Sequence, residues 1–349
     1  MKTALPLGLL EATRLTQAGR LVEATVAIQR LLREQPMPEP VNDPAPGRII
    51  DAEFSRVEEP RVGARQPRGR PGQFISASFE NEAGTRPYKL YIPTGYVGEP
   101  LPMIVMLHGC TQTPDDFAAG TRMNALAEKS GYFVLYPAQT RAANGSRCWN
   151  WFKRGHQRRG KGEPAILAGM TCECMSRYAI DPRRVYVAGL SAGGAMAAVL
   201  ASAYPDLYAA LGVHSGLAVG SAHDVQSAFA AMQGTPAARS AGWKRISKSV
   251  PAIVFHGDRD TTVHPRNGEQ VILESVDPAA ASSVERGQVP GGHAYTRTVH
   301  RDATGRVFLE HWLVHGAGHA WSGGSPSGSY TDPKGPDAAR AMLRFFDQT

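Results

Sequence analysis

Long apolar runs are missing from this chain of 349 residues. Without a stretch of about 18 consecutive apolar residues, it has no candidate for a helix that crosses a bilayer. Cysteine is also scarce, because four residues in a chain of this length are too few for a disulfide scaffold. They allow one or two bridges or none, so cysteine usage leaves the redox compartment open.

The N-terminus lacks the pattern of a secretory signal. Its apolar stretch, Ala4–Leu10, is short and is followed by Glu11 and Arg14. A signal needs an apolar region of about 7–15 residues and then a small-residue cleavage site. By this criterion we expect a cytoplasmic protein.

The composition is that of an ordinary globular protein, with 42% hydrophobic and 20% charged residues, which excludes wholesale disorder. The net charge of +7, from 38 basic and 31 acidic residues, is modest over this length. It indicates no nucleic-acid partner. The length allows one α/β domain of about 250 residues with an appendage, or two smaller domains.

Residues 1–34 predict an amphipathic helical hairpin that turns near Gly19. In its second helix Leu21, Ile28 and Leu32 share one face. A single hairpin cannot bury its own apolar face, since repeat arrays of this kind need about three repeats. We therefore expect it to pack on the rest of the chain or to form a homodimer.

Residues 35–72 predict a linker. They contain eight prolines and a cluster of arginines near their end, and no aromatic residues alternate with those arginines. A solvated basic linker therefore fits this segment better than a nucleic-acid site.

Residues 73–349 predict the main α/β domain. Strands and helices alternate here, which is typical of a mostly parallel sheet with helices on both faces, and short β-rich runs at the start predict an antiparallel beginning. The expected strands are Phe74–Phe79, Tyr88–Ile92, Met103–Leu107, Phe133–Tyr136, Val185–Ala188, Ala209–Val213, Ile253–Phe255 and Val307–Val314. The expected helices are Met123–Ser130, Pro164–Tyr178, Gly193–Ala203 and a closing helix, Asp337–Phe346.

The segment GLSAG, residues 189–193, lies directly between an expected strand and an expected helix. This is the context of a nucleophile elbow, a strained turn that exposes the Ser191 hydroxyl at the sheet edge. Glycine is needed two residues to either side, because a Cβ there would collide with the neighbouring strand and helix. The pattern alone is weak, but in this position it is specific.

A serine nucleophile needs a base, and the base needs an acid that orients it. In this architecture both follow the serine, acid first. The run HGDRDTTV, which ends an expected strand, offers Asp258 and Asp260. We favour Asp260, with Asp258 as the alternative, and either aspartate could instead cap a turn.

Six histidines follow the acid: His264, His293, His300, His311, His315 and His319. His319 lies well beyond the last expected strand, within a glycine-rich loop, HGAGHAWSGG, that can reach the serine. His311 and His315 alternate with apolar residues, as packed or surface side chains of a strand do. The four-residue spacing also resembles metal ligands on a helix, but Gly316 and Gly318 argue against a helix, so we predict no metal site.

An oxyanion hole is the remaining requirement. The segment IVMLHGCTQ ends a strand at His108-Gly109-Cys110. The backbone N–H of Cys110 is placed to act with that of Ala192, the residue after the nucleophile. Loss of one such donor typically lowers the rate about 10²–10³-fold.

Several segments together resemble the esterase family of poly(3-hydroxybutyrate) depolymerases. They are LHGCTQTPDDF, CWNWF, RRGKGE, VYVAGLSAGGAMAAVLASAYPDLYAALGVHSG and GAGHAWSGG, and they occur in the family's order from about Phe74 onwards. The resemblance implies an α/β-hydrolase fold without metal or organic cofactor. It implies a triad of Ser191, Asp260 and His319, an oxyanion hole at Cys110 and Ala192, and action on short-chain polyesters, aryl esters or feruloyl esters.

The resemblance also implies a disulfide between Cys110 and Cys148. Cys172 and Cys174, two apart on an expected helix, point in different directions, and we expect buried thiols there rather than a metal site. Tryptophans in the family's active-site segments are candidates for substrate contacts. We favour Trp321, which follows His319 closely, over Trp151 and Trp149, and Asn150 is a candidate for positioning the loop.

The leading hypothesis is a serine esterase that acts on 3-hydroxybutyrate-type polyesters or oligoesters. Secreted depolymerases usually carry a signal peptide and a C-terminal substrate-binding domain, neither of which is visible here, although the family is largely extracellular. A second hypothesis keeps the triad but replaces the substrate with a feruloyl, acetyl-xylan or aromatic polyester. A third is a non-catalytic scaffold on a hydrolase fold.

Overall fold

A large mixed β-sheet forms the centre of the computed structural model, which describes residues 72–235, 250–275 and 280–349. All of these belong to one compact unit. The helical hairpin predicted for residues 1–34, and the linker predicted for 35–72 apart from its last residue, lie outside the described residues.

The sheet has ten strands in the order β1-β2-β4-β3-β5-β6-β7-β10-β9-β8 among the described residues. Neighbours from β4 to β10 run parallel, and the pairs at both ends run antiparallel. The bounds are β1 Gln73–Asn81, β2 Gly84–Ile92, β3 Leu101–Leu107, β4 Phe133–Pro137, β5 Ile180–Leu190, β6 Ala210–His214, β7 Ala252–Gly257, β8 Ala281–Gln288, β9 Ala294–Arg301 and β10 Val307–Val314. Two short strands, β11 Trp321–Ser322 and β12 Thr331–Asp332, pair separately.

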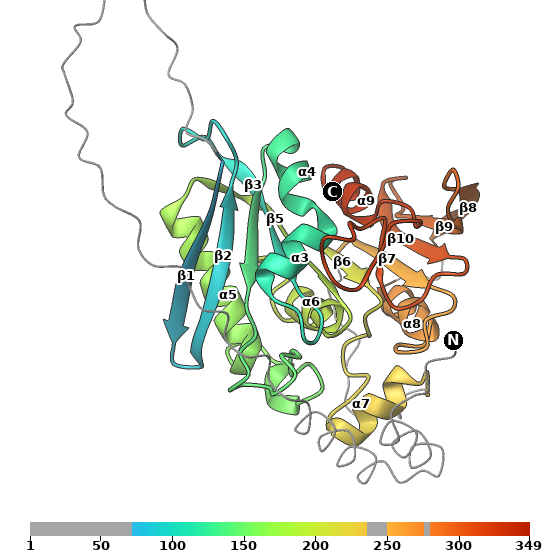
Figure 1. The fold of residues 1–349 in the computed structure, drawn as a ribbon, viewed down its shortest axis with the longest axis horizontal. Coiled ribbons are helices and arrows are strands. Elements are labelled where there is room, and N and C mark those ends of the chain that lie inside the picture. The colour runs from blue at the N-terminus through green and yellow to red at the C-terminus, as the bar shows by residue number, and fades with distance from the viewer. Residues whose placement is uncertain (1–71, 236–249, 276–279) are drawn as a thin grey trace, which may run out of the picture. The chain divides into compact units, whose positions relative to one another are not determined.

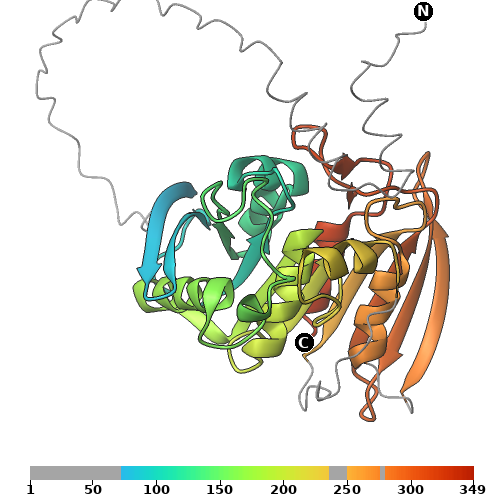
Figure 2. The same ribbon diagram turned by 90° about the horizontal axis from the view of Figure 1, so that it is seen from below.

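Helices cover both faces of this sheet, as Figures 1 and 2 show. Their bounds are α3 Pro114–Thr121, α4 Met123–Ser130, α5 Gly162–Arg177, α6 Ala192–Ala203, α7 Val225–Met232, α8 Arg266–Ser275 and α9 Ala338–Phe346, with a 3₁₀ turn η1 at Arg154–His156. Helices α5, α6 and α8 pack on one face of the sheet and form the first apolar core with it. Helices α3, α4 and α9 form the second core on the other face.

The central strands are apolar along their whole length because both of their faces are buried. In β3, Met103, Val105 and Leu107 point into the first core, whereas Ile104 and Met106 point into the second. This alternation is the two-residue period of a strand. An uninterrupted apolar run is therefore what a strand between two helical layers requires.

The expected strands and helices are all present within a few residues, and the antiparallel start is confirmed by β1 and β2. The closing helix begins one residue later than expected, at Ala338, because the Asp337 carboxylate accepts a hydrogen bond from the Arg340 N–H and caps the helix. Among the described residues, no helix has the length and apolar character needed to cross a membrane.

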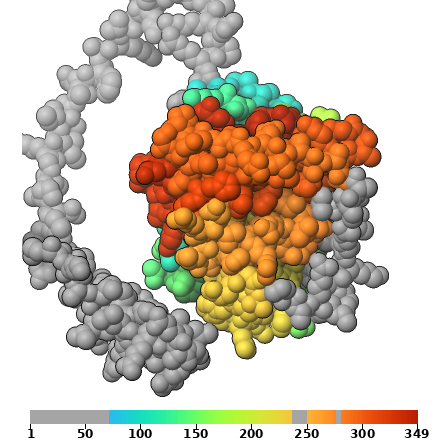
Figure 3. Space-filling view, turned by 90° about the vertical axis from the view of Figure 1, so that its right-hand side faces the viewer, coloured from blue at the N-terminus to red at the C-terminus, as the bar shows by residue number. Residues whose placement is uncertain are grey.

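Strands β8 and β9 were not expected from the sequence. They extend the sheet beyond β10 as an antiparallel pair, and Figure 3 looks onto this end of the molecule, where the orange segment forms much of the surface. Almost every β8 residue is exposed, so the strand has no buried face to give it an alternating apolar pattern.

Candidate active site

The candidate site residues follow the ends of parallel strands. Cys110 comes after β3, Ser191 after β5, Asp260 after β7 and His319 after β10. The carboxyl ends of parallel strands meet at one edge of a sheet, where ligands bind in α/β folds. This topology brings the loops that carry all four residues to the same edge.

Ser191 occupies a strained turn between β5 and α6. Its φ of 58° and ψ of −121° lie outside the usual regions for a residue with a side chain. A Cβ on Gly189 would lie 2.4 Å from the carbonyl carbon of Gly193, and a Cβ on Gly193 would lie 2.0 Å from the oxygen of Leu107. The two glycines are thus required by close backbone approach, as the sequence predicted.

Asp260 and His319 are joined by a hydrogen bond of 2.7 Å from Nδ1 to Oδ2. The other carboxylate oxygen accepts the backbone N–H groups of Thr262 and Val263, at 2.9 and 2.8 Å. Burial alone would raise the pKa of Asp260, but hydrogen bonds from His256 and His319 outweigh it and hold the pKa well below its usual range. An ionised carboxylate only accepts, so His319 carries its proton on Nδ1 and Nε2 is the basic nitrogen.

The alternative acid, Asp258, pairs with a different histidine. Its Oδ2 lies 2.9 Å from Nδ1 of His315, and its Oδ1 accepts the Gly316 N–H at 2.7 Å. Nε2 of His315 is also engaged, 2.8 Å from the Thr296 hydroxyl. Both nitrogens of this imidazole therefore have partners within the protein.

Two of the other four candidate histidines are held by structural contacts or by burial in the sheet. His293 is paired with Asp332 at 2.8 Å, and His311 lies in β10, where burial lowers its pKa to about 4. Within the three described ranges, no cluster of three or more histidine, cysteine, aspartate or glutamate residues is arranged to hold a metal ion.

The expected disulfide between Cys110 and Cys148 is present. It links the loop after β3 to the segment that contains Trp149 and Asn150, and the Thr111 N–H donates to the Ser146 oxygen at 2.7 Å across the same contact. Of the two free cysteines among the described residues, Cys174 is buried, as expected. The expectation of a buried thiol is wrong for Cys172, which faces solvent from the other side of α5.

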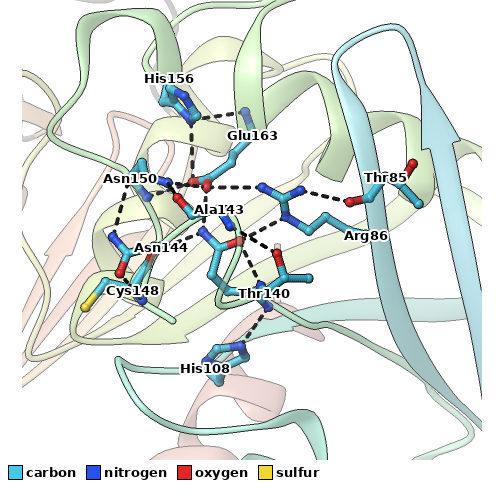
Figure 4. A network of polar contacts seen from close by, with 11 residues as sticks. Thr85, Arg86, His108, Thr140, Ala143, Asn144, Cys148, Asn150, His156 and Glu163 are labelled. Carbon is cyan, nitrogen blue, oxygen red and sulfur yellow. Dashed lines mark hydrogen bonds and ion pairs between the residues drawn. The ribbon is translucent and has the colours of Figure 1, made fainter. Parts of the chain in front are cut away.

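The segment around Cys148 is held by Glu163, a buried carboxylate at the start of α5 (Figure 4). Its oxygens accept the Asn150 backbone N–H and side-chain amide, each at 2.7 Å, and also the amide of Gln139. Burial would raise the pKa of Glu163, but hydrogen bonds from His156, Gln139 and Asn150 lower it overall. The carboxylate is therefore ionised and fixes this segment to the helix.

A second set of contacts fixes the loop after β3. The Trp149 indole donates to the His108 oxygen at 3.0 Å, and His108 Nε2 accepts the Gln139 N–H at 3.1 Å. The His108 Nδ1–H then donates to the Gly109 oxygen at 2.7 Å. Burial lowers the pKa of His108 to about 4, so its ring is neutral.

The four candidate substrate-contact residues, Trp149, Asn150, Trp151 and Trp321, are all buried. Trp149 and Asn150 make the loop contacts just described, and Trp151 packs in the first core. Trp321 stacks on His214, with ring centroids 5.1 Å apart, and contacts Phe117 edge to face. Its indole nitrogen has no hydrogen-bond partner among the described residues.

Two buried histidines at this edge were missed by the sequence analysis. His214 ends β6 and His256 lies in β7, each within a strand of otherwise apolar or small residues. The His256 Nε2 lies 2.8 Å from the Val263 oxygen and 3.4 Å from the Asp260 carboxylate. The feature of the sequence that could have identified them is a histidine near the carboxyl end of an otherwise apolar strand.

Comparison with known proteins gives a consistent match. Residues 86–277 match the family described as esterase PHB depolymerase. Poly(3-hydroxyalkanoate) depolymerase C of Paucimonas lemoignei is 32% identical over 250 residues, covering 68% of this chain and 59% of the depolymerase. This chain thus spans less than two thirds of that relative's length.

Other relatives are named as acetylxylan and feruloyl esterases. A probable acetylxylan esterase A of Aspergillus clavatus is 30% identical over 62% of this chain and 74% of its own length. Feruloyl esterase B of Thermothelomyces thermophilus is 26% identical over 71% of this chain and 87% of its own.

Among solved structures, an acetyl xylan esterase from Aspergillus awamori superposes with a TM-score of 0.56 at 21% identity, covering 76% of this chain and 94% of that one. An S-formylglutathione hydrolase from Agrobacterium tumefaciens gives 0.50 at 14% identity, covering 81% and 97%. The expected α/β-hydrolase fold is confirmed.

Proposed function

The chain belongs to the PHB depolymerase family of esterases, and from this premise we propose that it is a serine carboxylic-ester hydrolase with Ser191, His319 and Asp260 as its triad. The strained turn at Ser191, flanked by glycines that no larger residue could replace, is the observation that carries the proposal. Backbone strain at a serine between a strand and a helix is characteristic of a nucleophile.

In the proposed reaction the Ser191 Oγ attacks the ester carbonyl carbon while Nε2 of His319 takes the hydroxyl proton. The Asp260 carboxylate stabilises the resulting imidazolium, and the N–H groups of Cys110 and Ala192 stabilise the oxyanion. The alcohol leaves with the proton from His319, and an acyl-enzyme remains. Water then attacks under the same base, and the acid is released with Ser191 restored.

For the substrate we propose 3-hydroxybutyrate-type polyesters or oligoesters. The support is the relative from Paucimonas lemoignei, which is named as a poly(3-hydroxyalkanoate) depolymerase. Acetylated xylan or feruloyl esters are the second candidate, favoured by the relatives named as acetylxylan and feruloyl esterases.

The test compares hydrolysis of a 3-hydroxybutyrate oligomer, a series of p-nitrophenyl esters and methyl ferulate by the full chain and by its Ser191→Ala variant. We expect the substitution to lower kcat by about 10⁴–10⁶-fold without loss of fold. Serine-dependent release of 3-hydroxybutyrate supports the polyester substrate, and turnover of the aryl or feruloyl esters alone replaces it with the second candidate. If no ester is hydrolysed, the chain is a non-catalytic protein on a hydrolase fold.

A further inference from the structure

His214 connects two parts of the candidate site that are far apart in the sequence. Its backbone oxygen accepts the N–H of Ser191 at 2.8 Å. Its ring nitrogen Nε2 accepts the N–H of Ser322 at 2.9 Å, in the loop that carries His319. One residue thus contacts both the nucleophile turn and the histidine loop.

These contacts determine the protonation of the ring. Nε2 accepts a backbone N–H, so it carries no proton, and the single proton lies on Nδ1. Nδ1 then donates to the Ser215 hydroxyl at 3.1 Å. Burial, followed by the nearby histidines His256 and His319, lowers the pKa of His214 to about 3, so the ring is neutral at any pH at which an esterase would be assayed.

Packing fixes the plane of this ring. It stacks on Phe255, with centroids 5.8 Å apart and planes 15° apart, and on Trp321, at 5.1 Å and 27°. The side chain is fully buried. Stacking on both sides therefore holds the plane of the imidazole, and the hydrogen bond from the Ser322 N–H sets which edge of the ring faces the loop of His319.

We infer that His214 is a positioning residue that holds the loop of His319 in register with the turn of Ser191. This inference rests on the triad proposed above. Ser322 is three residues beyond His319, so release of its N–H from His214 would allow the histidine to shift relative to the serine. A misplacement of about 1 Å in such a geometry can lower the rate about 10²-fold.

Three substitutions separate the hydrogen bond from the packing. In His214→Gln, the longer side chain places an acceptor oxygen near the position of Nε2 and can still bind the Ser322 N–H. In His214→Asn, the polar atoms reach only the position of Nδ1. In His214→Phe, the ring shape is kept and both hydrogen bonds are lost.

We expect His214→Phe and His214→Asn to lower kcat about 10–100-fold with KM within about twofold. His214→Gln should recover most of that loss. The matched control is His311→Phe, which alters a half-buried histidine in β10, in the neighbouring part of the sheet. It should leave kcat and KM unchanged even if it lowers the melting temperature.

A spectroscopic measurement makes the test independent of activity. The low-field NMR signal of the Nδ1 proton that His319 shares with Asp260 reports the geometry of the loop. We expect this signal to shift or broaden in His214→Phe and His214→Asn, and to return in His214→Gln. All variants are compared below the melting transition of the least stable one.

The inference is overturned if folded His214→Phe keeps the wild-type kcat and signal, or if His214→Gln loses as much as His214→Asn. A uniform fall in melting temperature with kcat unchanged would likewise leave His214 as core packing only. If the wild type hydrolyses no ester, the proposed function fails on its own. The NMR signal then still decides whether His214 positions the loop.

Discussion

Asp260–His319 and Asp258–His315 are built from the same two loops, after β7 and β10, yet their surroundings differ. The Asp260 side chain is fully buried and that of His319 is 12% exposed, whereas the side chains of Asp258 and His315 are 34% and 40% exposed. In the first pair, called the inner pair, the Asp260 carboxylate accepts two backbone N–H groups in addition to the hydrogen bond with His319. In the second, the outer pair, Asp258 accepts one backbone N–H, that of Gly316.

The two pairs have the same chemical groups at nearly the same distance, so distance does not separate their roles. An exposed ion pair is screened by water and contributes about 0–1 kcal/mol. A buried carboxylate with several donors stays ionised and holds its histidine in one tautomer. The comparison teaches that burial, and what the second imidazole nitrogen contacts, distinguishes a candidate catalytic pair from a surface pair.

The sharpest test of this comparison replaces each aspartate with asparagine. We expect Asp260→Asn to lower kcat about 10³–10⁴-fold, because the amide no longer fixes the Nδ1–H tautomer of His319. Asp258→Asn should lower kcat less than about tenfold, since His315 is not the proposed base. Steady-state kinetics on the best ester substrate measure both, and equal losses would remove the distinction between the pairs.

The second-largest expected difference between the two pairs is in their contribution to the free energy of unfolding. Asp260→Ala leaves the buried Val263 N–H without its acceptor, and we expect a loss of about 3 kcal/mol in the free energy of unfolding. Asp258→Ala removes a half-exposed group and should cost about 1 kcal/mol. Urea unfolding of both variants gives these values, and the reverse order would contradict the burial argument.

The pH dependence of stability should differ in the same direction. The pKa of Asp260 is far below its usual value in the folded protein, so the unfolded state takes up a proton first as the pH falls. The stability that Asp260 contributes is therefore fully present above the unfolded pKa of about 3.9 and is lost below it. Between about pH 5 and pH 2, the free energy of unfolding should fall more steeply in the wild type than in Asp260→Ala.

The same differential should be smaller for Asp258. Burial would raise its pKa, but hydrogen bonds from His315 and Gly316 lower it overall, so the sign of the effect is the same. Unfolding curves at each pH for the wild type and both alanine variants test this. The buried neutral histidines are present in all three proteins, so their contribution cancels in the comparison. A flatter profile in Asp258→Ala than in Asp260→Ala would contradict the expectation.

The smallest effect is expected at His315. Because its side chain is 40% exposed, His315→Gln should change kcat within about twofold and stability within about 1 kcal/mol. His319→Gln, its counterpart in the inner pair, is the control and should abolish turnover. A large loss of activity in His315→Gln would mean that the outer pair also takes part in the reaction.

The sequence allowed the fold to be predicted where the chain is apolar on both sides or where a motif requires a particular backbone. The buried β3 run and the GLSAG turn are examples. Strands β8 and β9 could not be predicted in this way, because β8 is exposed along nearly its whole length and its partner is mostly half-buried.

The candidate acid illustrates a different limit. Asp258 and Asp260 lie two residues apart in one loop, so their spacing does not show which is the catalytic acid. Only the resemblance to the family favoured Asp260. What separates them is burial, which depends on His256 and on the turn at Val263. His214 was missed for a related reason, since its contacts with residues 191 and 322 exist only once β6 pairs with β5 and the segment after β10 reaches the end of β6.

Because of the disulfide between Cys110 and Cys148, the properties of the protein depend on the redox conditions under which it is purified. Closing a loop across 38 residues stabilises the folded state by about 4 kcal/mol in the chain-entropy description. Reduction would remove that contribution and leave a thiol on the residue whose N–H is assigned to the oxyanion. A sample purified with a reducing agent and one purified without it would then differ in stability and at the proposed oxyanion hole.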